Sequence, residues 1–188
     1  MYFLYNIILK LIIIVSPIIF LIRIISGKED PKRFLEKYSI ISKKKKNSKS
    51  VWIHAASVGE LISIIPILNK LEKDKKIKKI IVTTTTTSSS KIFLKFKFKK
   101  TFHKYFPLDS NYIINKFIDY WKPQLAIFVD SEIWPNTIKS LDSRKIPIII
   151  LNARITKHSF KKWKFFPKFA NEVFKKISLA LPQNNETY

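Results

Sequence analysis

Short apolar runs rich in β-branched residues recur at regular intervals, and this spacing constrains the fold more than any other feature of the sequence. Each run is short enough to be a buried strand. The runs begin at Val51, Lys79, Gln124, Ile146 and Ile177. Segments with helical spacing lie between them, over 58–73, 90–99, 111–121, 135–143 and 157–175. Because strands alternate with helices, the sequence predicts an α/β fold with a parallel sheet covered on both faces.

Composition excludes several kinds of site. The chain has 188 residues, of which 46% are hydrophobic and 26% charged, and this predicts one folded domain rather than a disordered tail. Because Gly27 and Gly59 are its two glycines, the glycine-rich loops that usually bind nucleotide phosphates cannot form. Cysteine is absent and the three histidines lie far apart, so the sequence predicts no metal site.

The N-terminal segment, residues 2–25, has about the 20 apolar residues that a helix needs to cross a hydrocarbon core. We interpret residues 1–27 as a membrane anchor, because the segment lacks the cleavage site and the short apolar region of a signal peptide. Basic residues outnumber acidic ones just beyond it, which predicts a cytoplasmic location for the rest of the chain. Lys10 also allows a helix that lies in the membrane interface, and a buried core helix is a further alternative.

The net charge of +23 points toward an anionic partner such as phosphorylated lipid, a bilayer surface or nucleic acid. A chain-wide compositional bias toward lysine explains the same charge equally well. Residues 96–100 and 158–169 interleave aromatic residues with lysines, an arrangement that suits single-stranded nucleic acid or a bilayer surface. The apolar N-terminal segment favours the bilayer.

The chain beyond the anchor divides into two parts. Residues 28–50 are basic, and 43–50 contain no apolar side chain, so we interpret them as a juxtamembrane segment and a linker. The folded domain is expected over residues 51–188. Parallel sheets bind ligands outside the carboxyl ends of their strands, so the residues that follow each strand are candidates for chemistry.

The motif Ser57-Val58-Gly59-Glu60 follows the first strand. It fits a capping box, in which Ser57 caps the helix and the Glu60 carboxylate bonds back to the N–H of the cap. A carboxylate in a cleft at a strand end is also suited to take a proton from an attacking hydroxyl. On spacing alone the capping role is favoured. Gly59 allows close approach to the helix start, where an anion is stabilised.

Polar residues follow the other strands as well. Residues 83–90, which include Thr84, all carry hydroxyl groups that would donate to a sugar or phosphate, although a strand end and a helix cap explain the run equally well. The third strand leads into an acidic pair that includes Glu132, in a chain where acid is scarce. Asn152 and Arg154 follow the fourth strand, and the guanidinium would pair with phosphate or form an ordinary salt bridge.

Seven ordered blocks resemble the N-terminal half of the 3-deoxy-D-manno-octulosonic acid (Kdo) transferases, membrane-associated enzymes that add Kdo to the lipid A precursor in lipopolysaccharide synthesis. The blocks are the N-terminal apolar segment, GKEDPKRFLEKY, WIHAASVGE, VTTTT, YFPLD, SEIWPN and LNARIT. The resemblance covers nearly the whole chain. It implies a glycosyltransferase-B architecture, in which two Rossmann-like domains face each other across a cleft and this chain is the first, acceptor-binding domain.

The resemblance also implies roles for particular residues. Glu60 matches the general base of the family, which would deprotonate a hydroxyl of the lipid A precursor for attack on CMP-Kdo. The acceptor-binding candidates are Ser57, Gly59, Thr84, Glu132, Asn152 and Arg154. The expected reaction is inverting, needs no metal or cofactor, and takes place at the cytoplasmic face of the inner membrane.

In the family the C-terminal domain binds CMP-Kdo, and this sequence ends about where that domain would begin. We therefore expect a donor-binding domain to act with the chain in cis or in trans, and the chain alone to be inactive or nearly so, because both reactants must be held together. Two alternatives remain open. One is a non-catalytic, membrane-anchored basic module that binds anionic lipid or, less favoured, nucleic acid. The other is an inactive remnant.

Overall fold

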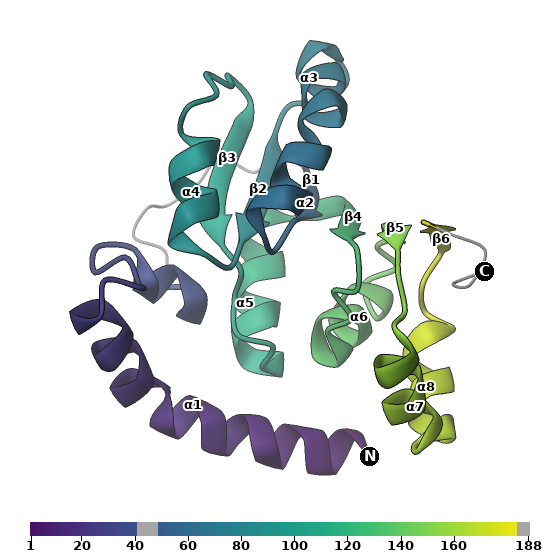
Figure 1. Ribbon diagram of the computed structural model, residues 1–188. Helices are drawn as coiled ribbons and strands as arrows, with labels where there is room; N and C mark the ends of the chain where they lie inside the picture. Colours follow the sequence, from purple (N-terminus) through teal and green to yellow (C-terminus); the bar gives the residue numbers. More distant parts are fainter. Residues whose placement is uncertain (41–48, 184–188) are drawn as a thin grey trace.

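The chain folds around a six-stranded sheet in which each strand is parallel to its neighbours (Figure 1). The structure is a computed structural model that describes residues 1–40 and 49–183. In order across the sheet, the strands are β3 (Thr101–Tyr105), β2 (Ile80–Thr84), β1 (Ser50–His54), β4 (Pro123–Val129), β5 (Ile148–Ala153) and β6 (Leu179–Pro182). The predicted α/β class with a Rossmann-like parallel sheet is confirmed.

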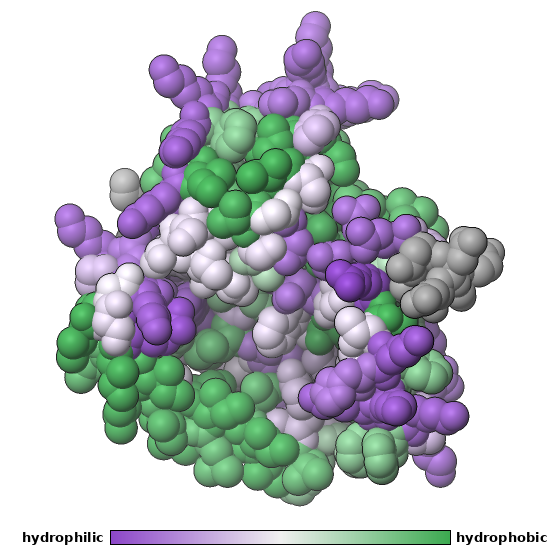
Figure 2. Space-filling model, viewed as in Figure 1, coloured by the Kyte–Doolittle hydropathy of each residue, from purple (hydrophilic) through white to green (hydrophobic). Residues whose placement is uncertain are grey.

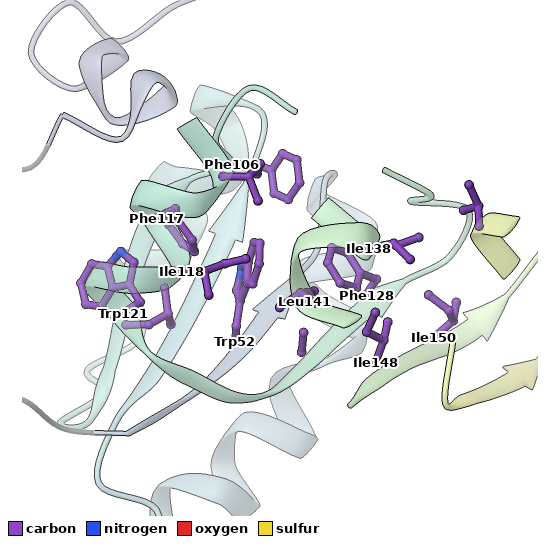
Figure 3. Close-up of a cluster of buried hydrophobic side chains, with 14 of the residues drawn as sticks. Trp52, Phe106, Phe117, Ile118, Trp121, Phe128, Ile138, Leu141, Ile148 and Ile150 are labelled. Carbon is purple, nitrogen blue, oxygen red and sulfur yellow. The ribbon is translucent and has the colours of Figure 1, made fainter. Parts of the chain in front are cut away.

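Helices connect the strands and cover both faces of the sheet (Figure 1). They are α2 (Val58–Ser63), α3 (Ile65–Lys73), α4 (Thr87–Phe93), α5 (Asn111–Trp121), α6 (Pro135–Asp142), α7 (Lys157–Lys164) and α8 (Pro167–Phe174). Successive strand residues point to opposite faces, so each face has its own apolar cluster. Trp52 packs with Phe117 and Phe128 on one face (Figure 3), and Ile53 lies in the cluster on the other. Burying each such side chain stabilises the fold by about 1.5–3 kcal/mol, which gives the strand ends a rigid support.

The apolar pattern predicts five strands, and β3 is a sixth that it misses. The strand has an inverted pattern, because Thr101 and His103 are buried while Phe102 is 45% exposed. The buried polar groups have partners: the Thr101 hydroxyl donates to a Glu72 carboxylate oxygen at 2.7 Å, and His103 Nε2 lies 2.9 Å from the Thr84 hydroxyl. Hydrogen bonds therefore satisfy the two buried polar residues of this edge strand.

Two of the predicted helices are each divided in two. The segment 58–73 forms α2 and α3, which meet at Ile64, and Pro66 stands in the first turn of α3. The segment 157–175 forms α7 and α8, and α8 begins at Pro167. Proline lacks the N–H that would continue a helix and favours the first turn of a new one, which explains both breaks.

The N-terminal segment forms α1 (Tyr2–Ile25), one helix of 24 residues that includes Pro17. By length and composition it could cross a membrane, but 11% of its most apolar window is buried, so it is not a core helix. It lies along the outside of the domain (Figure 1). A short 3-10 helix, η1 (Phe34–Tyr38), follows and contacts β3. Residues 43–48 of the predicted linker lie outside the described residues, and Ser50 already belongs to β1.

Candidate functional site

The strand order contains one switch point, between β1 and β4. From β1 the chain continues to β2 and β3 on one side, and it then crosses to β4, β5 and β6 on the other side. Open α/β sheets bind ligands in the crevice outside the carboxyl ends of the strands at such a point. The loop after β1 leads to Glu60, and the loop after β4 carries Glu132. Both predicted carboxylates therefore lie at the switch point.

Glu60 lies in the first turn of α2 and is partly exposed. Its carboxylate Oε2 accepts a hydrogen bond from the Ala56 N–H at 2.8 Å, and its own N–H donates to Ser57 Oγ at 3.3 Å. The motif is a capping box with one difference, because the carboxylate reaches the residue before the cap rather than Ser57 itself. Within the described residues, Oε1 of Glu60 makes no hydrogen bond. One oxygen is thus anchored and the other is free to accept a proton.

The start of α2 is open to solvent. Ser57 and Gly59 are both exposed, and a side chain at Gly59 would meet Ser57 Oγ first, at 4.0 Å. The free N–H groups of a helix start favour an anion, although α2 is short. The helix start is therefore accessible from solvent on the side of Ser57 and Gly59.

Glu132 is held by two side chains. Its Oε2 lies 3.3 Å from Nε2 of His54 and accepts the indole N–H of Trp134 at 2.8 Å. Burial raises the pKa of Glu132, but the hydrogen bonds from His54 and Trp134 outweigh burial and leave the pKa below its usual value. The carboxylate is therefore ionised and already engaged, unlike that of Glu60.

His54 is the donor of this pair. Its ring is completely buried, stacks on Phe106 with the centroids 4.0 Å apart, and points Nδ1 at the Thr83 carbonyl oxygen at 3.0 Å. Nδ1 lies equally close to the Thr83 hydroxyl, at 3.0 Å, and that hydroxyl can donate to it. Because an ionised carboxylate only accepts hydrogen bonds, Nε2 donates to Glu132. This hydrogen bond links the end of β1 to the loop after β4.

The hydroxyl run 83–90 has mainly internal partners. Thr84 is completely buried and its hydroxyl lies against His103, so it does not face the crevice. Thr85 donates to the Ala56 carbonyl at 2.9 Å, and Thr86 caps α4 by accepting from the Ser89 N–H at 3.1 Å. The strand-end and helix-cap interpretation therefore accounts for most of the run, and Thr84 is not available to a ligand.

Asn152 and Arg154 lie at the end of β5 and are exposed. Asn152 has a φ of +52°, which asparagine tolerates, at an irregularity in the pairing of β5 with β6. The Arg154 guanidinium makes no ion pair with any residue that the structure describes, so the ordinary salt bridge considered for it is absent there. Arg154 and Asp130 instead line a cavity of about 330 Å³, together with Trp163.

Reasoning from the sequence missed His54, which it considered only as a metal ligand. The signal was its position as the last residue of the first apolar strand, at the edge where ligands bind. Asp109, in the YFPLD block, was also missed. It is 3% exposed and accepts hydrogen bonds from the N–H groups of Asn136 and Thr137, at 3.0 and 2.8 Å. It thereby fixes the helix start that follows the Glu132 loop.

Comparison with known proteins identifies a family. Residues 32–188 match the family model of 3-deoxy-D-manno-octulosonic-acid transferase (kdotransferase). The 3-deoxy-D-manno-octulosonic acid transferase of Rickettsia bellii is 33% identical over 167 residues, which are 89% of this chain and 40% of the relative. That of Haemophilus influenzae is 33% identical over 135 residues, 72% of this chain and 32% of the relative. The chain thus spans between 32% and 40% of the length of these curated relatives.

Solved structures share the fold. A putative UDP-N-acetylglucosamine 2-epimerase from Listeria monocytogenes superposes with a TM-score of 0.53 at 14% identity, over 73% of this chain and 39% of that chain. A second UDP-N-acetylglucosamine 2-epimerase gives a TM-score of 0.52 at 13% identity, over 75% of this chain and 43% of that chain. At these identities the similarity concerns the fold alone.

Proposed function

The chain belongs to the 3-deoxy-D-manno-octulosonic-acid transferase family, and from this premise we propose that it is the acceptor-binding domain of an enzyme that transfers Kdo from CMP-Kdo to the lipid A precursor. The observation that carries the proposal is the Glu60 carboxylate. It lies at the switch point of the sheet, has one oxygen anchored on the Ala56 N–H, and faces an open helix start. This is the geometry that a general base needs.

In the proposed reaction Glu60 accepts the proton of a sugar hydroxyl on the lipid acceptor. The hydroxyl oxygen forms a bond to the anomeric carbon of Kdo, while the bond from that carbon to the CMP phosphate breaks and CMP leaves. Attack from the opposite side inverts the configuration. Arg154, which is exposed and has no ion pair among the described residues, is assigned to a phosphate of the acceptor.

Glu132 and His54 are assigned a supporting role. Their hydrogen bond joins the end of β1 to the loop after β4, so it fixes the two segments that flank the switch point. Misplacing reacting groups by about 1 Å can cost roughly 10²-fold in rate, so a contact that fixes these segments supports catalysis. Because Glu132 is already engaged by two donors, we assign the base to Glu60 rather than to Glu132.

Donor binding is assigned to a second domain, present in cis or supplied in trans, in the part of the relatives that this chain does not span. The chain by itself is then expected to give little or no transfer. A split between acceptor and donor domains also explains why the sequence has no glycine-rich nucleotide loop.

The test is the substitution Glu60→Gln, assayed with a donor-binding domain supplied. Glutamine can still accept from the Ala56 N–H but cannot take a proton, so folding should be retained while transfer falls by about 10²–10⁴-fold. Glu172→Gln, an exposed residue of α8, is the matched control and should keep wild-type activity. If the Glu60→Gln variant transfers Kdo at the wild-type rate, Glu60 is not the general base.

A second candidate, a non-catalytic basic module that binds anionic lipid, is favoured by α7, in which no residue is buried and four are lysines. This candidate predicts lipid binding without transfer, whatever donor domain is supplied. Nucleic acid as its ligand would show binding that weakens steeply between about 50 and 200 mM salt. If Kdo transfer is measurable and depends on Glu60, the chain is part of an enzyme and not a non-catalytic module.

A further inference from the structure

Helix α1 has two different faces. The face toward the domain is a stripe at helical spacing, and it holds the polar residues of the helix except Lys10. The stripe consists of Tyr2, Tyr5, Asn6, Leu9, Ile13, Ser16, Phe20, Arg23 and Ile24. The outer face is apolar and strongly exposed, with Phe3 at 80%, Ile14 at 72% and Ile25 at 78%. Figure 2 shows it as a continuous hydrophobic band along α1.

The first turns of α1 are fastened to the domain by hydrogen bonds. The Tyr5 hydroxyl donates to buried Asp109 at 2.7 Å, and the Asn136 amide donates to Asn6 Oδ1 at 2.8 Å. The Tyr2 and Tyr5 rings also contact Phe169 of α8, with centroids 5.0 and 6.2 Å apart. The start of α1 therefore lies against α6 and α8.

The last turns of α1 are fastened to the segment that follows it. Ser16 Oγ lies 2.5 Å from the Tyr38 hydroxyl, and Phe20, 7% exposed, packs on the Tyr38 ring at 5.6 Å. Glu29 then joins Arg23 at 3.1 Å to Lys37 at 2.7 Å. Through η1 this end of the helix is held near β3, whereas the start of α1 lies near α6 and α8 (Figure 1).

A helix held at both ends by one domain cannot cross a bilayer, because crossing would carry one end about 30 Å away from the domain. It would also leave the polar stripe in lipid and deprive buried Asp109 of the Tyr5 hydroxyl. We propose that α1 lies flat in the interface of one leaflet, with its outer face among the acyl chains and the domain on the water side. The long stem of Lys10 lets its ammonium reach the headgroups.

A neighbouring surface extends the proposed contact. The junction of α7 and α8 exposes Phe165 at 81% and Phe166 at 50%, and Trp163 of α7 stacks on Phe169, the residue that the first turns of α1 contact. Exposed lysines alternate with these aromatic rings, at Lys161, Lys162, Lys164 and Lys168. Aromatic rings at headgroup level beside lysines are complementary to an anionic bilayer. This commits the apolar face to a lipid surface rather than to a protein partner.

The geometry also relates the membrane to the candidate site. The Tyr2 hydroxyl donates at 3.3 Å to the carbonyl of Pro135, the first residue of α6, which directly follows the loop that carries Glu132. The Glu132 loop is thus attached to the helix that lies in the membrane, at the carboxyl edge of the sheet. A lipid acceptor would reach the switch point without leaving its leaflet. The orientation of α1 itself does not depend on any transfer activity.

Depth measurements on vesicles test the proposal, and the absence of cysteine permits single labels. Phe3→Cys, Ile14→Cys and Ile25→Cys place a fluorophore at the start, middle and end of the outer face, and Ile62→Cys, 53% exposed on α2, is the control. The full chain is bound to vesicles of phosphatidylglycerol and phosphatidylcholine that carry quenchers at the headgroup or along the acyl chain. Because all four positions are exposed, the variants should fold normally.

The expected result is one shallow depth for all three α1 positions and no quenching at position 62. A spanning helix would instead put position 14 at the bilayer centre and positions 3 and 25 at opposite surfaces, and this result would overturn the proposal. Failure of the chain to bind the vesicles, which a protein-docking face predicts, would overturn it too. The vesicles contain neither sugar acceptor nor donor, so the outcome is separate from that of the Glu60 experiment.

Discussion

Glu132 Oε2 lies 3.3 Å from Nε2 of His54, and this contact joins residues that are 78 positions apart in the sequence. It crosses the switch point between β1 and β4, which is where open α/β sheets bind their ligands. The histidine is completely buried, whereas the glutamate side chain is 23% exposed. The buried ring therefore positions a carboxylate at the edge of the crevice, and the role of Glu132 follows from its partner.

Glu132→Ala should leave the Nε2–H group of His54 without its acceptor. We expect the free energy of unfolding to fall by about 1–3 kcal/mol, as for a buried group that loses its hydrogen bond, and kcat to fall by roughly 10²-fold through misplacement. The acceptor KM should change little, because Glu132 positions loops rather than binding the acceptor. The proton on Nε2 of His54, followed by NMR, should lose its hydrogen-bonded resonance. A fully active variant with an unchanged His54 spectrum would show that the pair is dispensable.

Arg154→Ala should weaken acceptor binding and leave the stability of the fold nearly unchanged. The guanidinium is exposed and makes no ion pair within the described residues, so the change should alter stability by less than about 0.5 kcal/mol. If Arg154 holds an acceptor phosphate, the acceptor KM should rise about 10-fold or more, since hydrogen bonds to charged groups are worth roughly 1.5–3 kcal/mol. Arg144→Ala, which removes the ion pair with Asp119 at 2.8 Å, is the control and should leave KM unchanged.

Asp109→Asn should destabilise the whole N-terminal attachment. Asp109 accepts from Tyr5, from two backbone N–H groups at the start of α6, and from the Thr137 hydroxyl at 2.6 Å. An amide cannot accept all of these, so urea unfolding should show a loss of about 1.5–3 kcal/mol. Asp119→Asn, whose side chain is 64% exposed, should cost less than about 1 kcal/mol. Equal losses for the two variants would contradict the structural role of Asp109.

Because of His103, part of the free energy of unfolding should be lost at acid pH. Burial and the neighbouring Arg33 charge lower the pKa of His103 to about 3, whereas an unfolded histidine titrates near 6.5. Between these values the unfolded chain binds a proton that the folded chain does not. The free energy of unfolding should therefore fall as the pH drops below about 6.5, by at most about 1.4 kcal/mol per pH unit.

The measurement is urea unfolding between about pH 7 and pH 5, where most carboxylates stay ionised. His103→Gln should flatten the pH dependence, whatever its effect on stability at pH 7. His158→Gln, at an exposed position of α7, should keep the wild-type slope. If both variants keep the slope, His103 is not its source.

The sheet could be predicted from the sequence because the central strands are apolar on both sides. Ile53 and Trp52 both point into apolar clusters, and such continuous runs are typical of buried parallel strands. Edge strand β3 could not be predicted in this way, since its buried residues Thr101 and His103 are polar and each depends on a partner far away in the chain. Apolar periodicity carries no information about such pairs.

The candidate site, like the sheet, could be predicted only in part. Glu60 and Glu132 were identified from motifs and from their places after strands, and the structure puts both at one switch point. The hydrogen bond between Glu132 and His54 was not, because it depends on a side-chain orientation that no local pattern encodes. The roles of Glu60, Ser57, Gly59, Asn152 and Arg154 in binding and catalysis stay predictions.

The stripe on α1 constrains the number of residues in the helix more strictly than it constrains which apolar residues the helix contains. Each residue of an α-helix turns the chain by about 100° and advances it by about 1.5 Å. Deleting one residue between Tyr5 and Ser16 would therefore rotate the first turns away from Asp109 while Phe20 stayed in place. Evolution can exchange one aliphatic residue for another along the outer face, but insertions and deletions in this helix should be rare.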